Sequence, residues 1–489
     1  MQDIKDLALI IESHVPIIVL ETHDETRALQ LLTRVAMQHQ LGYFSWSITE
    51  GLNRALFEER RNADPESPTE VLKLIKRNTA KSLYALCDFH PYLHNQPEHV
   101  RLLKDIALAY SRLGHTLILI SHELELPAEL KRFSAKFSLS LPGDAQLMAL
   151  IREEAQVWNR ENPQTPLQSD PAVLKKLVRN LRGLTEADAR RLVRGVIRDD
   201  GAINASDIPD VNRAKFDMLD MGSVLSYEYD TARFSDVGGL NKLKDWIGKR
   251  EHAINSGGRD RPKGALLLGV QGSGKSLAAK AIAGLWGLPL LRLDMAALYN
   301  KYIGETEKNL RKSLEQAELM APCVLWMDEI EKGLAGDSQD EGTSRRVLGT
   351  LLTWMAEREA NVFMVATAND VSGLPPELMR KGRFDEIFFV DLPNLDARSE
   401  IFSIHLRQRN FDPATFDIAA LAARAQDFSG AEIEQAVVAA LYSASARRTP
   451  LDTAMILREI DATYPLAVTL SEKITALRQW AEGRTVLAG

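Results

Sequence analysis

The second half of the chain alternates short apolar runs with helical patterns. Residues 265–268 form a continuous apolar run, followed by a glycine-rich turn and then by residues 277–283, which have the composition of a helix. Two further apolar runs, residues 323–327 and 362–368, each end at polar side chains. Continuous runs of this length are typical of strands that are covered on both faces. The pattern predicts an α/β fold with a doubly wound parallel sheet.

Size and composition indicate a globular protein with more than one domain. The chain has 489 residues, more than one hydrophobic core usually organises. The net charge of −7 disfavours avid binding to nucleic acid, which needs a basic surface. Cys87 and Cys323 lie in apolar runs, so they predict neither a disulfide framework nor a zinc site. Since no apolar run could span a bilayer and the N-terminus is unlike a signal peptide, we expect a cytoplasmic protein without membrane insertion.

A phosphate-binding motif follows the first apolar run. The stretch from Gly269 to Ser276 fits the pattern G-x-x-x-x-G-K-[ST] between a predicted strand and a predicted helix. Glycines let backbone N–H groups close around phosphates, and a helix N-terminus attracts anions. We expect Lys275 to reach the β- and γ-phosphates and the Ser276 hydroxyl to bind Mg²⁺. A glycine-rich turn that binds nothing is the alternative. The predicted nucleotide-binding residues here are Gly269, Val270, Gln271, Gly272, Ser273, Gly274, Lys275, Ser276 and Leu277.

Polar residues end the next two predicted strands. Asp328 and Glu329 follow residues 323–327, and Asn369 follows residues 362–368. In P-loop enzymes the first acid holds the Mg²⁺ shell and a neighbouring carboxylate orients or deprotonates the attacking water. We therefore assign Asp328 to the metal, Glu329 to the water and Asn369 to sensing the γ-phosphate. Alone, two acids or an asparagine at a strand end are common solvated or turn residues.

These motifs, in this order, resemble an AAA+ ATPase of the branch that includes protein unfoldases and microtubule-severing enzymes. The likeness runs from Phe234 to Thr449 and extends to a group of plastid and cyanobacterial open-reading-frame ATPases with bacterial relatives. It implies a P-loop NTPase with a C-terminal helical lid, which hydrolyses ATP with Mg²⁺. It also implies further cofactor-binding residues around the adenine and ribose and at the lid, which are Asp236, Val237, Gly238, His405, Gly430 and Ala431.

The resemblance implies that neighbouring subunits complete each other's sites. Arg380 and Arg383 are similar to the arginine-finger stretch of the family, whose arginines act in the neighbouring subunit. A guanidinium is always charged and forks onto phosphate oxygens, which suits this role. The expected partners are further copies of the chain, in a homo-hexamer. The alternative is a pair of ordinary surface arginines near a turn.

A short aromatic segment resembles the loop that lines the central pore of protein-translocating members. It consists of Lys301, Tyr302, Ile303 and Gly304. An aromatic face packs against a polypeptide without reading its sequence, so the resemblance implies an unidentified protein substrate. The alternative is that Tyr302 is a core residue before the helix that begins near Thr306.

The first half resembles a degenerate AAA-like copy. Residues 17–20, 83–87 and 116–120 are apolar runs in the same succession, but residues 21–28 lack the glycines and the lysine. In this alignment Asp88 lies at the metal-binding position and Phe89 replaces the water-orienting acid. The alternative is an unrelated α/β domain with chance echoes, because alternating strands and helices repeat in any doubly wound fold.

Together these patterns predict four segments. They are residues 1–198, an N-terminal α/β domain; 199–233, a linker; 234–395, the nucleotide-binding subdomain; and 396–489, the helical lid with C-terminal helices. The leading hypothesis for function is an ATP-driven ring that remodels or threads proteins. The alternatives are an ATP-gated scaffold or regulatory switch, and a motor or loader for nucleic acid, which the charge disfavours.

Overall fold

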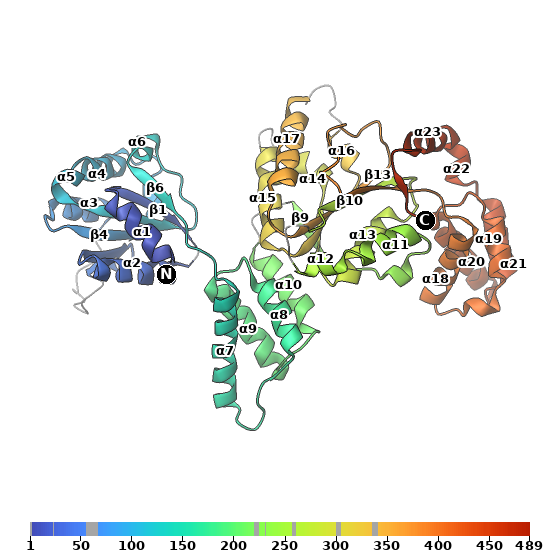
Figure 1. The fold of residues 1–489 in the computed structure, drawn as a ribbon, viewed down its shortest axis with the longest axis horizontal. Coiled ribbons are helices and arrows are strands. Elements are labelled where there is room, and N and C mark those ends of the chain that lie inside the picture. Colours follow the sequence, from blue (N-terminus) through green and yellow to red (C-terminus); the bar gives the residue numbers. More distant parts are fainter. Residues whose placement is uncertain are drawn as a thin grey trace. The chain divides into compact units, whose positions relative to one another are not determined.

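The computed structural model describes residues 2–22, 24–54, 67–219, 224–229, 231–256, 261–299, 305–334 and 341–489. The chain divides into two compact units (Figure 1). One comprises Met1–Arg152 and Gly183–Val193, and the other comprises Glu153–Arg182 and Arg194–Gly489. Within the described residues, the structure contains no helix that is both long and apolar enough to cross a membrane.

The first unit is built on a six-stranded sheet with the order β3-β2-β4-β5-β1-β6. The pairs are parallel except that of β2 with β3. The strands are β1 (Ile17–Glu21), β2 (Gly42–Ser47), β3 (Gly51–Arg54), β4 (Ser82–Cys87), β5 (Thr116–Ser121) and β6 (Ser134–Phe137). The helices are α1 (Gln2–Glu12), α2 (Glu25–Gln38), α3 (Pro68–Arg77), η1 (His90–Tyr92), α4 (Pro97–Leu108), α5 (Tyr110–Leu113) and α6 (Ala128–Lys131).

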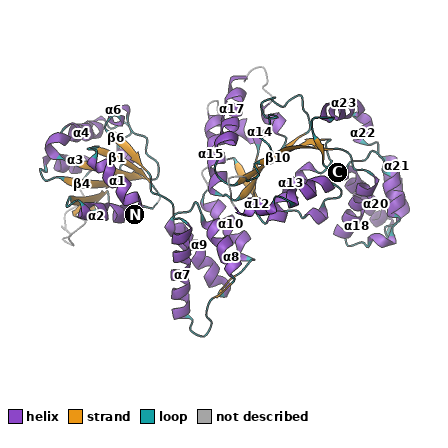
Figure 2. Cartoon of the chain, in the orientation of Figure 1, coloured by secondary structure: helices purple, strands orange, loops and turns teal. Residues whose placement is uncertain are grey.

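Both faces of this sheet are buried, as the continuous apolar runs predict. Ile17 and Val19 of β1 pack in one hydrophobic cluster, with residues of α3 and α4. Ile18 and Leu20 of the same strand pack in a second cluster, with residues of α1 and α2. Helices therefore cover the strands on both sides (Figure 2), which is the doubly wound arrangement.

A helical stretch follows the first sheet. It contains α7 (Asp144–Glu161), β7 (Gln168–Ser169), α8 (Pro171–Leu181), α9 (Glu186–Asp200), β8 (Ala202–Ile203) and α10 (Asp207–Met218). Asp170 caps the start of α8, and its side chain accepts the Ala172 N–H. Pro171 is the first residue of the helix, and both residue types are typical of these positions.

The segment at residues 199–233 contains more regular structure than a linker. It includes β8, α10 and the strand β9 (Leu225–Glu228), which pairs antiparallel with β11 (Leu290–Leu293) of the second sheet. The sequence does not predict α10, because its buried face includes a charged residue, Lys215. This lysine is 1% exposed, and its Nζ donates to the Arg182 carbonyl. A lysine can bury its aliphatic stem in this way.

The second unit contains a seven-stranded sheet with the order β15-β14-β10-β13-β12-β11-β9. Its remaining strands are β10 (Gly264–Gly269), β12 (Cys323–Met327), β13 (Val362–Ala368), β14 (Glu386–Val390) and β15 (Val486–Leu487). Its helices are η2 (Phe234–Asp236), α11 (Asn241–Gly248), α12 (Glu251–Ser256), α13 (Lys275–Trp286), α14 (Met295–Tyr299), α15 (Glu305–Leu319), α16 (Ile330–Leu334) and α17 (Glu341–Glu357).

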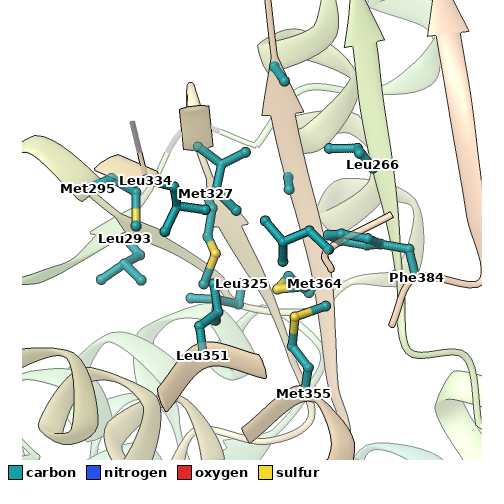
Figure 3. Packing of buried hydrophobic residues seen from close by; sticks show 14 of the residues in the cluster. Leu266, Leu293, Met295, Leu325, Met327, Leu334, Leu351, Met355, Met364 and Phe384 are labelled. Atoms are coloured by element: carbon teal, nitrogen blue, oxygen red, sulfur yellow. The ribbon is translucent and has the colours of Figure 1, made fainter. Parts of the chain in front are cut away.

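This sheet is also covered on both faces. Alternate residues of β10, β12 and β13 enter two separate clusters, one of which includes α13 and the other α15 and α17. Figure 3 shows Met327, Met355 and Met364 packed with Leu325 and Leu351 in the second of these clusters. Flexible methionine side chains fill the irregular spaces between sheet and helices. The predicted doubly wound fold is confirmed.

Helices after the sheet form a lid with its own core. They are α18 (Leu395–Gln408), η3 (Pro413–Thr415), α19 (Ile418–Arg424), α20 (Gly430–Arg447) and α21 (Thr453–Ala462). The chain continues through α22 (Leu466–Thr469) and α23 (Ser471–Ala481). Leu477 and Ala481 of α23 join the core beneath the sheet, and β15 pairs with β14. The last residues therefore return to the sheet instead of completing the lid.

Candidate functional site

The glycine-rich motif lies at the carboxyl end of β10, whose neighbours are β13 and β14. Gly269 is required by packing, since a Cβ there would lie 2.0 Å from the Val390 carbonyl oxygen. Gly272 and Gly274 have φ values of +75° and +93°, which glycine adopts without the steric penalty of other residues. The fold therefore needs glycine at these positions, in addition to any requirement of a ligand.

Lys275 begins α13 and is 6% exposed. Its Nζ donates hydrogen bonds of 3.0 Å and 2.7 Å to the carbonyl oxygens of Gly269 and Val270. Burial lowers the pKa of Lys275 to about 8, and three nearby carboxylates oppose this shift. A buried cation of this kind favours an anion beside it, because the anion stabilises the charged form.

Ser276 and Asp328 meet between α13 and the end of β12. The Ser276 hydroxyl donates to Oδ1 of Asp328 over 3.2 Å. Thr367 on β13 donates to the same oxygen over 2.6 Å, and Nη2 of Arg292 lies 3.5 Å from Oδ2. A hydroxyl and a carboxylate are hard oxygen donors of the kind that Mg²⁺ prefers. The two residues predicted to hold the metal are adjacent, and their donor atoms fit this ion.

Glu329 is held from several sides. Its φ is +48°, a conformation uncommon outside glycine that occurs often at functional sites. Its N–H donates to Oγ1 of Thr367 over 3.0 Å. Nδ2 of Asn369 donates to Oε1 of Glu329 over 2.8 Å, and Nζ of Lys332 pairs with Oε2. The structure thus brings together the acid and the asparagine that were predicted from separate strand ends.

Three residues of this network are missed by the sequence prediction. Glu331 is 7% exposed, and its Oε1 accepts the backbone N–H of Asn369 over 2.8 Å. Burial raises the pKa of the Glu331 carboxyl group. Thr367 and Arg292 both contact Asp328. The available signal was the position of Glu331, a third acid two residues after Glu329.

A cavity of about 390 Å³ opens beside the motif. Its lining also includes residues of η2, α18 and α20. His405 lies there, with Nδ1 3.8 Å from Oε1 of Glu434, and burial lowers the pKa of its ring. The predicted residues that line the cavity are Asp236, Val237, Gly238, Gln271, Gly272, Ser273, Gly274, Lys275, Ser276, Leu277, Asp328, Glu329, Asn369, His405, Gly430 and Ala431. Thr367, Ile401, Ile404 and Glu434 also line it and were not predicted.

The lid closes one wall of this cavity by contacting the glycine-rich loop. The Ala431 N–H donates to the Gly272 carbonyl over 3.2 Å. A Cβ on Gly272 would come within 2.9 Å of Oγ of Ser429. Ser429 caps α20 in a reciprocal arrangement with Glu432, which is the capping box. Movement of the lid would therefore be transmitted directly to the loop.

The remaining predicted residues lie elsewhere. Arg380 and Arg383 are absent from the described lining of the cavity. Arg380 is exposed, and Nη1 of Arg383 donates to the Leu352 carbonyl. Gly269 and Val270 contribute carbonyl oxygens to Lys275 instead of lining the cavity. The predicted pore-loop residues Lys301, Tyr302, Ile303 and Gly304 lie outside the described residues.

Comparison with known families gives the class of the protein. Residues 265–392 match the family model of the AAA ATPases, the ATPase family associated with various cellular activities. Residues 3–139 and 145–222 match the N-terminal and second domains of SpoVK-like AAA ATPases. The chain belongs to the AAA ATPase family.

Individual proteins of this family are also similar to the chain. The chain is 34% identical to an uncharacterized AAA domain-containing protein, ycf46, of Guillardia theta, over 98% of this chain and 95% of that protein. The ycf46 protein of Trieres chinensis is also 34% identical, over 99% and 97% of the two chains. A proteasome-activating nucleotidase of Aeropyrum pernix is 37% identical over 53% of this chain and 66% of its own length. The predicted resemblance is confirmed.

The sheet of the first half repeats the strand order of the second. Numbered along the chain, the parallel strands β1, β2, β4, β5 and β6 and the strands β10 to β14 both follow the order 5-1-4-3-2. This shared order supports the interpretation of the first half as an AAA-like copy. At the place of the glycine-rich loop, Oδ1 of Asp24 accepts the Arg27 N–H at the start of α2, so an acid caps the helix there.

The structure corrects the predicted alignment of Asp88 and Phe89 by one residue. Cys87 packs on the sheet face that carries α2, and Trp326 packs on the equivalent face that carries α13. Because side chains alternate along a strand, Cys87 corresponds to Asp328, two residues after Trp326. Asp88 then corresponds to Glu329, and the two share left-handed φ values of +50° and +48°. Phe89 replaces no catalytic acid.

Proposed function

We propose that the chain hydrolyses Mg-ATP in the cavity of its second half and works as a homo-hexameric ring that remodels or threads a protein substrate. The observation that carries the proposal is the convergence of three pieces at one cavity. They are the buried cation of Lys275, the Ser276–Asp328 pair, and Glu329 held by Asn369. Family membership supports nucleotide binding, since the matched residues 265–392 span all three.

Each residue has a role that follows from its surroundings. Lys275 and the N–H groups at the start of α13 bind the β- and γ-phosphates. Ser276 and Asp328 hold Mg²⁺, which neutralises phosphate charge when bound. Glu329 orients the attacking water and accepts its proton, and Asn369 keeps the carboxylate in place and contacts the γ-phosphate. Residues around His405 hold the base and ribose.

The ring is proposed from the arginines. Arg380 and Arg383 are absent from the described lining of the cavity in their own chain. A guanidinium supplied by a neighbouring copy would stabilise the charge that develops during hydrolysis. Two relatives have names that connect them with proteolysis. A proteasome-activating nucleotidase and the ATP-dependent zinc metalloprotease FtsH of Pirellula staleyi are 37% and 33% identical to this chain over about half of its length. This likeness to proteins connected with proteolysis supports a protein substrate, and we propose that the chain remodels it.

The test is the steady-state ATPase rate per subunit against protein concentration, with particle size measured in the presence of ATP. A trans-acting ring requires that the rate rises as the chain assembles and collapses in Arg383→Ala. Arg27→Ala is the control and should keep the rate, since this arginine lies in the first half, where its partly buried side chain pairs with Asp3. A rate that is independent of concentration and survives Arg383→Ala would overturn the ring. Turnover that no unfolded protein stimulates would overturn the remodelling role.

A further inference from the structure

The first half carries a cluster of metal-binding side chains where the second half carries its catalytic residues. One ligand atom from each of Asp88, His90 and His122 lies within 4.8 Å of the other two. By the corrected alignment, Asp88 corresponds to Glu329, and His90, two residues later, corresponds to Glu331. His122 follows β5 as Asn369 follows β13.

The corresponding positions lie close together in both halves. In the second half, Asn369 donates to Glu329 and to Glu331, over 2.8 Å in each case. In the first half, the rings of His90 and His122 have centroids 5.0 Å apart and are nearly perpendicular. Nδ1 of His90 lies 4.0 Å from Oδ1 of Asp88. The shared fold therefore brings these three positions together in both halves, although the side chains differ.

The loop that carries Asp88 and His90 is anchored in the hydrophobic core. Phe89, between Asp88 and His90, is fully buried and packs edge-on against Trp46 and Tyr92. The Asp88 N–H continues the ladder by donating to the Ile120 carbonyl over 2.9 Å. Asp88 and His90 on either side of the buried ring remain accessible, with side chains 68% and 29% exposed. The ligands are thus held on a fixed backbone but open to an ion from solvent.

A hydrogen bond selects the tautomer of His90. Oγ of Ser121 lies 2.7 Å from Nδ1 of His90 and 3.2 Å from the Glu123 carbonyl oxygen. Because the hydroxyl has a single proton, both contacts are hydrogen bonds at once only in the tautomer that carries its proton on Nδ1, which leaves the lone pair on Nε2. A histidine whose second nitrogen donates to a fixed acceptor is the usual state of a metal ligand.

We propose that Asp88, His90 and His122 bind a divalent first-row transition metal ion of the Zn²⁺ type. Two imidazoles and one carboxylate suit such an ion better than Mg²⁺, which takes oxygen ligands. Ligand nitrogens and oxygens lie about 2.0 to 2.2 Å from Zn²⁺, so the side chains must close from their present separation around the ion. Water would complete the coordination. The first half would then bind an ion at the edge of its own sheet that is equivalent to the nucleotide-binding edge of the second sheet.

The experiment titrates Co²⁺, and separately Zn²⁺, into the full chain after treatment with a chelator and without nucleotide. The visible absorption of Co²⁺ reports tetrahedral coordination, and calorimetry gives the stoichiometry. The proposal predicts one ion per chain, loss of at least 100-fold in affinity in His90→Gln/His122→Gln, and a loss of roughly 10- to 100-fold in Ser121→Ala, which removes the partner of Nδ1.

Two control variants separate this site from other sources of binding. His14→Gln removes an exposed histidine of the same unit outside the cluster, and Asp328→Asn removes the metal carboxylate of the nucleotide site. Both should bind Co²⁺ as the wild type does, and circular dichroism should show that all variants are folded. Wild-type protein that binds neither ion, or binding that persists in the folded His90→Gln/His122→Gln variant, would overturn the proposal.

Discussion

The side-chain amide of Asn369 donates a 2.8 Å hydrogen bond to Oε1 of Glu329, joining the ends of β13 and β12. The backbone N–H of the same asparagine donates to Glu331 over 2.8 Å. One residue therefore fixes two carboxylates beside Lys275, and the geometry of Glu329 depends on it. This dependence can be tested by mutation.

Asn369→Ala should lower kcat by roughly 100-fold, because Glu329 loses the donor that orients it toward water. Asn369→Asp should be at least as severe, since a carboxylate cannot donate and repels Glu329. ATP affinity, measured by fluorescence of a labelled nucleotide, should change little in both. Asn53→Ala, in the first half, is the control. A kcat within twofold of wild type in Asn369→Ala would contradict this role.

ATP affinity should depend on the protonation of Lys275. Burial lowers its pKa to about 8, and phosphate binds the charged form, so affinity should fall as pH rises through that value. Binding above it should take up one proton, because the bound anion raises the pKa again. Calorimetry in buffers of different ionisation enthalpy measures this uptake.

Lys275→Arg provides the control for the proton uptake. Arginine stays charged throughout the accessible range, so binding to this variant should take up no proton at the same pH. An ATP affinity of the wild type that is constant from about pH 7 to about 9.5, well above and below the lowered pKa, would contradict the prediction.

Thr367→Val should weaken the binding of Mg²⁺ to the nucleotide site. The hydroxyl donates to Asp328 over 2.6 Å and accepts from the Glu329 N–H over 3.0 Å. Valine keeps the shape but leaves both groups without this partner. We expect the Mg²⁺ concentration for half-maximal ATPase activity to rise by roughly 10- to 100-fold. An unchanged Mg²⁺ titration would show that Thr367 has no part in holding Asp328.

Gly269→Ala should destabilise the second unit by about 1 to 3 kcal/mol, because the new methyl group would overlap the Val390 carbonyl and force β14 to move. Gly349→Ala in α17 is the matched control, since nothing lies within 4 Å of its added Cβ. It should raise stability by up to about 1 kcal/mol through helix propensity. Urea unfolding measures both. Equal stabilities of the two variants would contradict the packing argument.

The fold and most of the nucleotide site could be predicted from the sequence. Continuous apolar runs and the spacing from Gly269 to Ser276 specify a strand, a loop and a helix, and the carboxyl ends of parallel strands bring Asp328, Glu329 and Asn369 together. Glu331, Thr367 and Arg292 could not be assigned, because their roles depend on hydrogen bonds and an ion pair to residues far away in the sequence. No local pattern records those contacts.

Two other features were hidden for different reasons. Helix α10 was expected to be linker, because a buried lysine such as Lys215 reads as a solvated residue in a polar segment. Asp88 was aligned one residue off, because the strand pattern does not show which face Cys87 occupies. In an apolar run that is buried on both faces, the sequence does not show which residues face which side of the sheet. The structure shows this directly.

The most direct test of the central claim is a single-turnover measurement of ATP cleavage by Glu329→Gln beside the wild type. Glutamine keeps the size of the side chain and can still contact Asn369, but it cannot accept the proton of the attacking water. We predict that the variant binds ATP within a few-fold of wild-type affinity and cleaves it at least roughly 100-fold more slowly. A variant that binds ATP and cleaves it at the wild-type rate would contradict the account.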